Sequence, residues 1–209
     1  MLDFSTLTLF IIAALVLLIT PGPAVLYIIA RSVDQGRLAG IVSTLGIGVG
    51  TLVHVIAAAL GVSALLVSSA LAFNIVKYLG AAYLIYLGIR KLMERDQPQL
   101  PGEIQTQSLG RIFSQGIVVN ILNPKTALFF FAFLPQFINV EQGGIAWQII
   151  LLGTIFVTLG IFSDGLYALL AGSVGHWLRG NLRFLRGQRY FAGMAFIALG
   201  VTAAVSRKK

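Results

Sequence analysis

The longest stretch of this chain without Lys, Arg, Asp or Glu runs from residue 38 to residue 76. As one helix its 39 residues would extend for about 58 Å at about 1.5 Å per residue, roughly twice the ~30 Å hydrocarbon core of a bilayer. The segment must therefore turn once, and Ser68-Ser69 is the expected place. The sequence thus predicts two membrane helices here, and His54 is the one titratable side chain in the stretch 38–76.

The composition of the whole chain also indicates a membrane protein. It has 57% hydrophobic and 11% charged residues, whereas soluble domains have about 25% charged residues. A soluble core of this size cannot bury so much apolar surface, so lipid is expected to solvate most of it. The net charge of +8 is expected from basic loops rather than from nucleic-acid binding. With no cysteine, the chain has no disulfide and no thiolate metal site.

Six apolar segments are predicted to span the membrane as α-helices. They are placed at residues 4–30, 38–67, 71–89, 112–138, 146–172 and 190–206. The start of the chain lacks the basic n-region of a signal peptide, so the first segment is expected to stay in the mature protein. The polar stretch 94–110 contains Pro98, Pro101 and Gly102 and is predicted to be a cytoplasmic linker. It divides the transport domain into two units, residues 1–93 and 111–209.

Basic residues are distributed unevenly between the two sides of these spans. Ten Lys and Arg fall after spans one, three and five, and four fall on the other side. The positive-inside rule therefore places the three basic loops in the cytoplasm and both termini outside. The C-terminus is itself basic, and this favours the cytoplasmic side for it. That placement would require that one of the six spans does not cross the membrane. Each unit holds three spans, so the two units are expected to be inverted repeats with a substrate site between them near the midplane.

Two predicted spans are broken at corresponding positions, about 103 residues apart. The breaks are Thr20-Pro21-Gly22-Pro23 and Asn123-Pro124-Lys125. Thr and Asn are good N-caps, and Pro is favoured at the first helical position, so Thr20 and Asn123 are expected to cap new half-helices. Two such helix N-termini directed at one cavity would bind a carboxylate. The alternative is a pair of simple proline kinks, which membrane helices tolerate.

Ionisable residues inside membrane spans are costly and usually functional. Lys125 is expected to bind substrate, or else only to pair with Asp164 in the fifth span. Asp164 is expected to hold an amine, to pair with Lys125 or to carry a proton. His54 is either a second proton-coupling group or a side chain hydrogen-bonded to a neighbour. Asn120 and Asn123, spaced i and i+3, are expected to line the same cavity.

Two further features are predicted to be architectural. Gly46 and Gly50 form a small-xxx-small pair, which suits close helix packing within the chain or the face of a homodimer. The basic, amphipathic segment 177–186 is expected to lie at the cytoplasmic interface.

Four motifs together resemble the lysine exporter family, which includes the homoserine/threonine efflux proteins. They are Thr20-Pro21-Gly22-Pro23 followed by Gly36 and Gly40, residues 80–88, Asn120 to Lys125 followed by residues 133–137, and residues 163–167. The resemblance covers essentially the whole chain. It implies a bacterial inner-membrane exporter of amino acids, a secondary carrier driven by ion gradients. It does not fix which amino acid is exported.

The charges fit a zwitterionic amino acid as substrate. Its carboxylate suits the breaks and Lys125, and its ammonium suits Asp164; a purely cationic or anionic substrate would leave one buried charge unpaired. No cofactor is expected.

A metal-cation or other small-solute exporter is the main alternative, although the two histidines are distant from each other. A membrane enzyme is disfavoured because neither G-x-S-x-G nor H-E-x-x-H is present. A non-transporting scaffold would need neither paired breaks nor buried charges.

Overall fold

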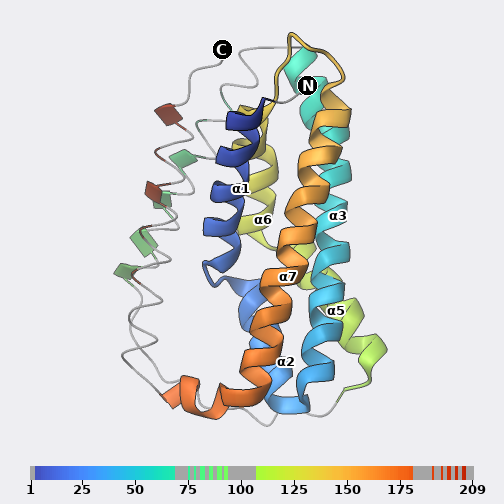
Figure 1. Ribbon diagram of the computed structural model, residues 1–209, viewed down its shortest axis with the longest axis vertical. Helices are drawn as coiled ribbons and strands as arrows, with labels where there is room; N and C mark the ends of the chain where they lie inside the picture. Colours follow the sequence, from blue (N-terminus) through green and yellow to red (C-terminus); the bar gives the residue numbers. More distant parts are fainter. Residues whose placement is uncertain are drawn as a thin grey trace.

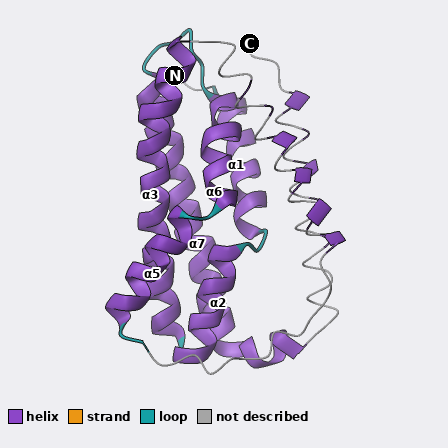
Figure 2. Ribbon diagram, turned by 180° about the vertical axis from the view of Figure 1, so that it is seen from behind, coloured by secondary structure: helices purple, strands orange, loops and turns teal. Residues whose placement is uncertain are grey.

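The computed structural model describes residues 3–68 and 107–180, with isolated positions between and after them. Those positions are residues 75, 78, 81–82, 85–86, 89–90, 92–93, 190, 194, 197–198, 201 and 204–205. All regular structure in the described part is helical, arranged as an elongated bundle (Figures 1 and 2). Most of the predicted third and sixth spans, the linker 94–110 and the segment 177–186 lie outside the described residues, as does Ser69 of the predicted turn.

The first predicted span is two helices, α1 (Phe4–Ile19) and α2 (Pro23–Gln35), bent by 50°. The predicted break is confirmed, but its predicted cap is wrong. Thr20 ends α1, and Gly22 is the N-cap of α2. The reason is that a proline disfavours helical backbone in the residue before it, so Pro23 forces Gly22 to be extended and the new helix begins at Pro23.

The fourth predicted span is broken in the same way. Helix α5 (Leu109–Ile121) is followed by α6 (Pro124–Leu128), the π-helical turn η1 (Phe129–Phe133) and the 3-10 turn η2 (Leu134–Phe137), with a bend of 47° at the break. Here the predicted cap is confirmed. The Asn123 side chain accepts a hydrogen bond from the backbone N–H of Lys125 at 3.1 Å, and Pro124 is the first helical residue.

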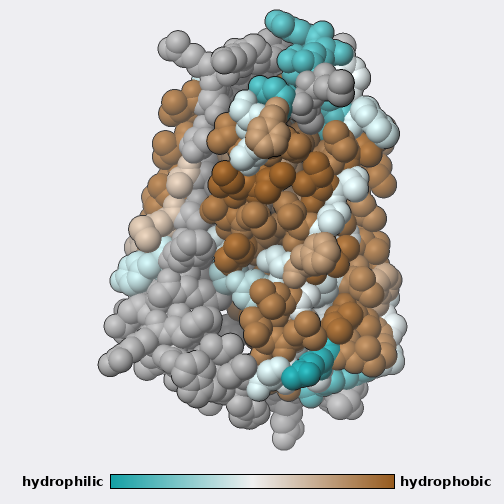
Figure 3. Space-filling model, viewed as in Figure 1, coloured by the Kyte–Doolittle hydropathy of each residue, from teal (hydrophilic) through white to brown (hydrophobic). Residues whose placement is uncertain are grey.

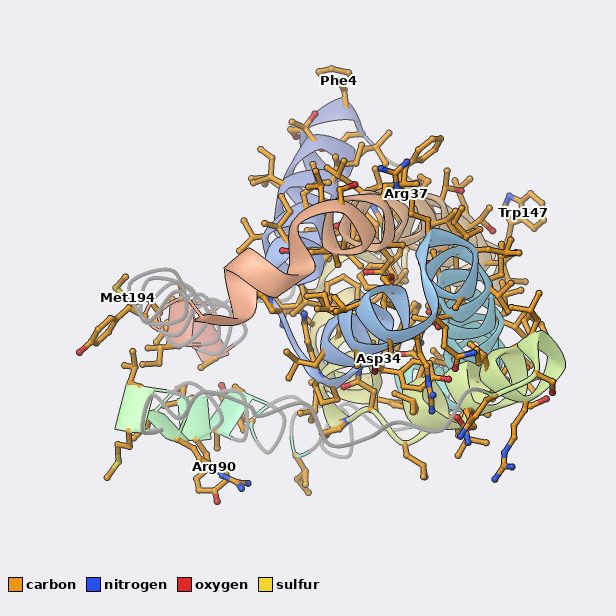
Figure 4. The ribbon with its side chains drawn as sticks, turned by 90° about the horizontal axis from the view of Figure 1, so that it is seen from below. Phe4, Asp34, Arg37, Arg90, Trp147 and Met194 are labelled. Atoms are coloured by element: carbon orange, nitrogen blue, oxygen red, sulfur yellow. The ribbon has the colours of Figure 1, made fainter. Side chains whose placement is uncertain are left out.

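Two long helices complete the described bundle, α3 (Arg37–Ser68) and α7 (Ile145–Gly180). Their segments Arg37–Gly61 and Ile145–Ser173 are long and apolar enough to cross a membrane. The part of the chain that is described therefore has two helices that could span a membrane, or four candidate spans if each bent pair is one span. Hydrophobic residues dominate the middle of the face seen in Figure 3, and Phe4 and Trp147 point away from the bundle in Figure 4, as expected for a surface in lipid.

The two broken spans run in opposite directions along the bundle. In Figure 1, α1 lies above α2, whereas α5 lies below α6. Each broken span is followed by a long helix, and these also run in opposite directions. Gly36 alone joins α2 to α3, with φ of 84°, a value that favours glycine. The prediction of a loop holding Arg31 and Arg37 is therefore wrong, because α2 continues through Arg31 and α3 begins at Arg37.

Glycines bring α3 and α5 into close contact. A Cβ atom on Gly46 would lie 2.3 Å from the Phe113 carbonyl oxygen, and one on Gly50 would lie 2.8 Å from that of Ile117. From the other side, a Cβ on Gly116 would lie 3.0 Å from the Ser43 carbonyl oxygen. The structure thus uses the small-xxx-small pair inside the chain, to pack the first half on the second.

Replacing Gly46 with Val should destabilise the protein strongly, because its backbone neighbour cannot move aside as a side chain would. Overpacking a tight core costs about 1–3 kcal/mol, and a backbone clash is expected to lie at or above that range. Gly61→Val in the same helix is the matched control, because nothing lies within 4 Å of its Cβ position. Thermal unfolding in detergent measures the difference, and equal midpoints for the two variants would contradict the packing role.

Candidate functional site

A cavity of about 30 Å³ lies between the two breaks. All four described spans contribute to its wall. Its polar lining consists of Thr44, Thr51, Asn120, Asn123, Lys125, Thr126 and Asp164. Of the predicted site residues, Gly22 lines it as well. Thr20, Pro21, Pro23 and Pro124 form the adjoining breaks, and His54 lies behind Asn120.

Lys125 of the second break lies directly against the first break. Its buried Nζ donates a hydrogen bond to the Thr20 carbonyl oxygen. Its side chain also passes close to Gly22, where a Cβ would lie 3.1 Å from Lys125 Cδ. Glycine at this position therefore leaves room for the lysine, and the two breaks form one structural unit.

The prolines remove N–H groups that the helices would otherwise use, and side chains from elsewhere take their place. Pro23 has no N–H for the carbonyl of Ile19, and the Tyr167 hydroxyl donates to that oxygen at 2.7 Å. Pro124 has none for the carbonyl of Asn120. That oxygen accepts from the backbone N–H of Asn123 at 3.0 Å and lies 2.9 Å from His54 Nε2. Because a carbonyl oxygen only accepts, a hydrogen bond between these two atoms requires the proton of His54 on Nε2.

The Asn120 side chain is fully hydrogen-bonded. Its Nδ2 donates to the Ile47 carbonyl oxygen at 3.0 Å and to Thr51 Oγ1 at 2.8 Å. Its Oδ1 accepts from Asn123 Nδ2 at 3.2 Å and from Thr126 Oγ1 at 3.0 Å. An amide has two donors and two acceptor lone pairs, so none is left for another molecule in this conformation. Asn120 therefore fixes the second break to α3.

Asp164 brings the opposite charge to the same cavity. It lies on α7, is 5% exposed, and interacts electrostatically with Lys125. Buried charges are tolerated when they are compensated, so each of these two residues makes the other acceptable. The first turn of α2 also lines the cavity at Ala24 and Val25, whose N–H groups have no partner within the helix. The site thus brings a lysine, an aspartate and the first turn of a helix together around one enclosed space.

In the described part of the chain, the structure gives two residues contacts that the sequence did not indicate. Tyr167 appeared only as part of a motif, although its spacing of three residues from Asp164 places both on one face of α7. Arg31 was assigned to a loop, whereas it lies in α2 and is 8% exposed. Among the described residues, no group of three or more His, Asp or Glu is arranged to hold a metal ion.

Comparison with known proteins gives a consistent result. A family model for the LysE type translocator matches residues 15–207. A homoserine/homoserine lactone efflux protein of Salmonella typhimurium is 33% identical over 198 residues, covering 95% of each chain. A leucine efflux protein of Salmonella choleraesuis is 26% identical, covering 93% of this chain and 92% of its own. An uncharacterized membrane protein of Bacillus subtilis is 29% identical, covering 96% of this chain and 99% of its own. No solved structure matches the chain.

Replacing Asn120 with Ala should destabilise the protein, because four partner groups lose a hydrogen bond inside the bundle. Leaving buried polar groups unsatisfied costs about 1–3 kcal/mol each, so the melting temperature should fall clearly. Asn139→Ala, the same change at an exposed loop position, is the control. A melting temperature for Asn120→Ala equal to that of the control would show that the network contributes little.

Proposed function

The chain belongs to the family of LysE type translocators, and we propose that it exports amino acids or close derivatives from the bacterial cytoplasm. In this proposal it is a multi-pass inner-membrane carrier driven by the proton gradient. The family and the names of the relatives indicate a transporter rather than an enzyme. The efflux of homoserine, homoserine lactone and leucine named for those relatives supports a small amino-acid-like substrate.

The observation that carries the proposal is that Lys125 and Asp164 are buried and line one cavity between the two breaks. An amino-acid zwitterion has one charge of each sign and matches this pair. We assign its carboxylate to Lys125 and to the N–H groups of Ala24 and Val25 in the first turn of α2, and its ammonium to Asp164. When Lys125 and Asp164 separate, the substrate carboxylate takes the place of Asp164 beside the lysine, and the substrate ammonium takes the place of Lys125 beside the aspartate. No buried charge is then left uncompensated.

Transport requires the cavity to open. Its volume of about 30 Å³ has room for water rather than for an amino acid. We infer that the two halves rock apart on one side at a time and exchange the Lys125–Thr20 contact for contacts with the substrate. The opposite directions of the two broken spans support six helices in two inverted repeats, 1–93 and 111–209, joined by the cytoplasmic linker 94–110.

Proton coupling is assigned to Asp164, with His54 as a second group. Protonation of Asp164 from the outside would release the substrate ammonium, because a neutral carboxylic acid no longer compensates it. His54 is buried, and its ring nitrogen contacts the backbone carbonyl of Asn120 at the second break. A change in its protonation would therefore act on the same segment that carries Lys125.

The test is amino-acid release from cells that express the chain and are loaded with a panel of dipeptides. Selective release of one chemical group of amino acids is expected from the wild type. Asp164→Asn should lose gradient-driven release and keep passive exchange, because asparagine still accepts a hydrogen bond but carries no proton cycle. Full active export by Asp164→Asn would remove the proton role. No release from wild-type protein located in the membrane would reject amino-acid export and favour another small solute.

Lys125→Met should raise the KM for the exported amino acid at least about tenfold from both sides of the membrane, which is the effect of losing one charge-assisted hydrogen bond. Transport assays in right-side-out and everted vesicles measure this. The double variant Lys125→Met with Asp164→Asn restores charge balance and serves as a control for folding. An unchanged KM in Lys125→Met would make the lysine only a partner of Asp164.

A further inference from the structure

A second polar cluster lies outside the cavity, near the end of α2. It consists of Tyr27, Arg31 and Gln35 from the first half, Gln107 from the linker, and Ile112 and Gln115 from the second half. This Arg31 cluster lies about 9 Å along α2 from the cavity-lining Val25, at about 1.5 Å per residue. It is at the end of the bundle where α2 meets α3 and α5 begins (Figure 1). The charge pattern predicts that this end faces the cytoplasm.

Arg31 is a buried cation held by neutral groups. Its Nη2 donates to Gln115 Oε1 at 3.0 Å, and its Nη1 lies 3.5 Å from Gln35 Oε1. Its guanidinium carbon is 5.5 Å from the centre of the Tyr27 ring. Amide oxygens compensate a guanidinium less well than a carboxylate does, because they carry only partial charge. The guanidinium is therefore buried against amide oxygens, although a carboxylate would compensate its charge better.

The same contacts join the two halves. The Tyr27 hydroxyl donates to the Ile112 carbonyl oxygen at 2.8 Å. Gln35 Nε2 donates to the Gln107 carbonyl oxygen at 2.8 Å, and the Gln107 N–H donates back to Gln35 Oε1 at 3.0 Å. Movement of the halves away from each other at this end would break these hydrogen bonds. It would take Gln115 from Arg31 and expose the guanidinium to the path that leads to the cavity.

We propose that Arg31 is a carboxylate-binding subsite at the cytoplasmic mouth of the transport path, where Gln115 Oε1 occupies the place of a carboxylate oxygen while the mouth is closed. This inference rests on the proposed function. In the open state Arg31 binds the carboxylate of an amino acid. As the halves close, Gln115 displaces that carboxylate, which passes to Lys125 and the first turn of α2.

The chemistry of the guanidinium fixes the ligand class. Its planar fork matches the two oxygens of a carboxylate, and the Tyr27 ring covers one of its faces, so a ligand approaches in the plane of the donors. An amino-acid lactone has the same ammonium group but no carboxylate. Arg31 should therefore assist free amino acids and be indifferent to lactones.

The experiment compares homoserine with homoserine lactone in everted membrane vesicles, whose exposed face is the cytoplasmic one. Arg31→Gln should raise the KM for homoserine about tenfold, the effect of losing a charge-assisted pair, and leave the KM for the lactone within about twofold. In right-side-out vesicles the KM for both compounds should stay unchanged. That one-sided effect separates Arg31 from Lys125, whose loss should act on both sides.

Two further variants keep the result interpretable. Arg111→Gln removes the same charge from an exposed position at the same end of the bundle and should change neither KM. Gln115→Glu retains Arg31 and its packing but adds an internal carboxylate, which should compete with homoserine and raise its KM alone.

Three results would overturn the inference. One is an equal loss of homoserine and lactone transport in Arg31→Gln, which would indicate a structural role. Another is an unchanged homoserine KM in Arg31→Gln or in Gln115→Glu. A wild type that moves neither homoserine nor its lactone, nor any amino acid of the dipeptide panel, would reject the proposed function together with this subsite, whereas the first two results would leave the proposed function standing.

Discussion

The structure depends on the need to satisfy backbone carbonyl groups that prolines leave without donors inside an apolar bundle. In lipid no water is at hand to replace a missing N–H, so each such carbonyl needs a partner from the protein. Tyr167 supplies one to Ile19, and His54 contacts the oxygen of Asn120. The end of α1 also leaves the Thr20 carbonyl without a helical donor, and Lys125 supplies that one. These side chains come from α7, α6 and α3, so the breaks draw the bundle together around them.

These side-chain hydrogen bonds stabilise the breaks, and some of them can be exchanged for hydrogen bonds to another molecule. A backbone hydrogen bond inside a helix has no competitor, whereas a carbonyl bonded by a lysine can lose that partner to an incoming anion. The contact between Lys125 and Thr20 is therefore a natural point of movement between the halves. Asn120 has the opposite character, because its four hydrogen bonds hold the second break against α3 with no capacity left over. One break thus combines a fixed element with a replaceable one.

The sequence predicts the position of a break correctly where the local residues allow only one starting point for the new helix. Asn123 before Pro124 is such a case, since only one N-cap is compatible with that proline. Two prolines close together at the first break allow two starting points, and the backbone restriction before Pro23 decides between them. Contacts that depend on distant elements were beyond local reasoning. The sequence around Gly46 does not indicate whether the glycine packs on α5 or on another chain. The sequence around Tyr167 does not indicate which carbonyl oxygen its hydroxyl contacts.

Arg31 shows a different limit. Counting charges to orient spans treats any arginine near the end of an apolar run as a loop residue, yet helix α2 continues past it to Gln35. Arg31 is held by Gln35, four residues further along α2, and by Gln115, which is 84 residues away in sequence. Neither glutamine is charged, so a search for ion pairs does not find them. A neutral partner for a buried cation is informative once it is seen in space, because it is the arrangement expected where a charged partner arrives from outside.

The two ends of the bundle are closed by different chemistry, and this bears on how it opens. At the α2–α5 end the first half is joined by hydrogen bonds to Gln107 of the linker and to Ile112 and Gln115 of the second half. At the other end Phe10 of α1 packs against Phe129 and Phe137, with ring centres 5.9 and 5.3 Å apart. Water can replace broken hydrogen bonds at small net cost, whereas exposing aromatic rings costs about 25 cal/mol for each Å² of apolar surface. The polar end should therefore admit water and a zwitterion more readily, and the aromatic end should open only when the substrate charges have been compensated inside.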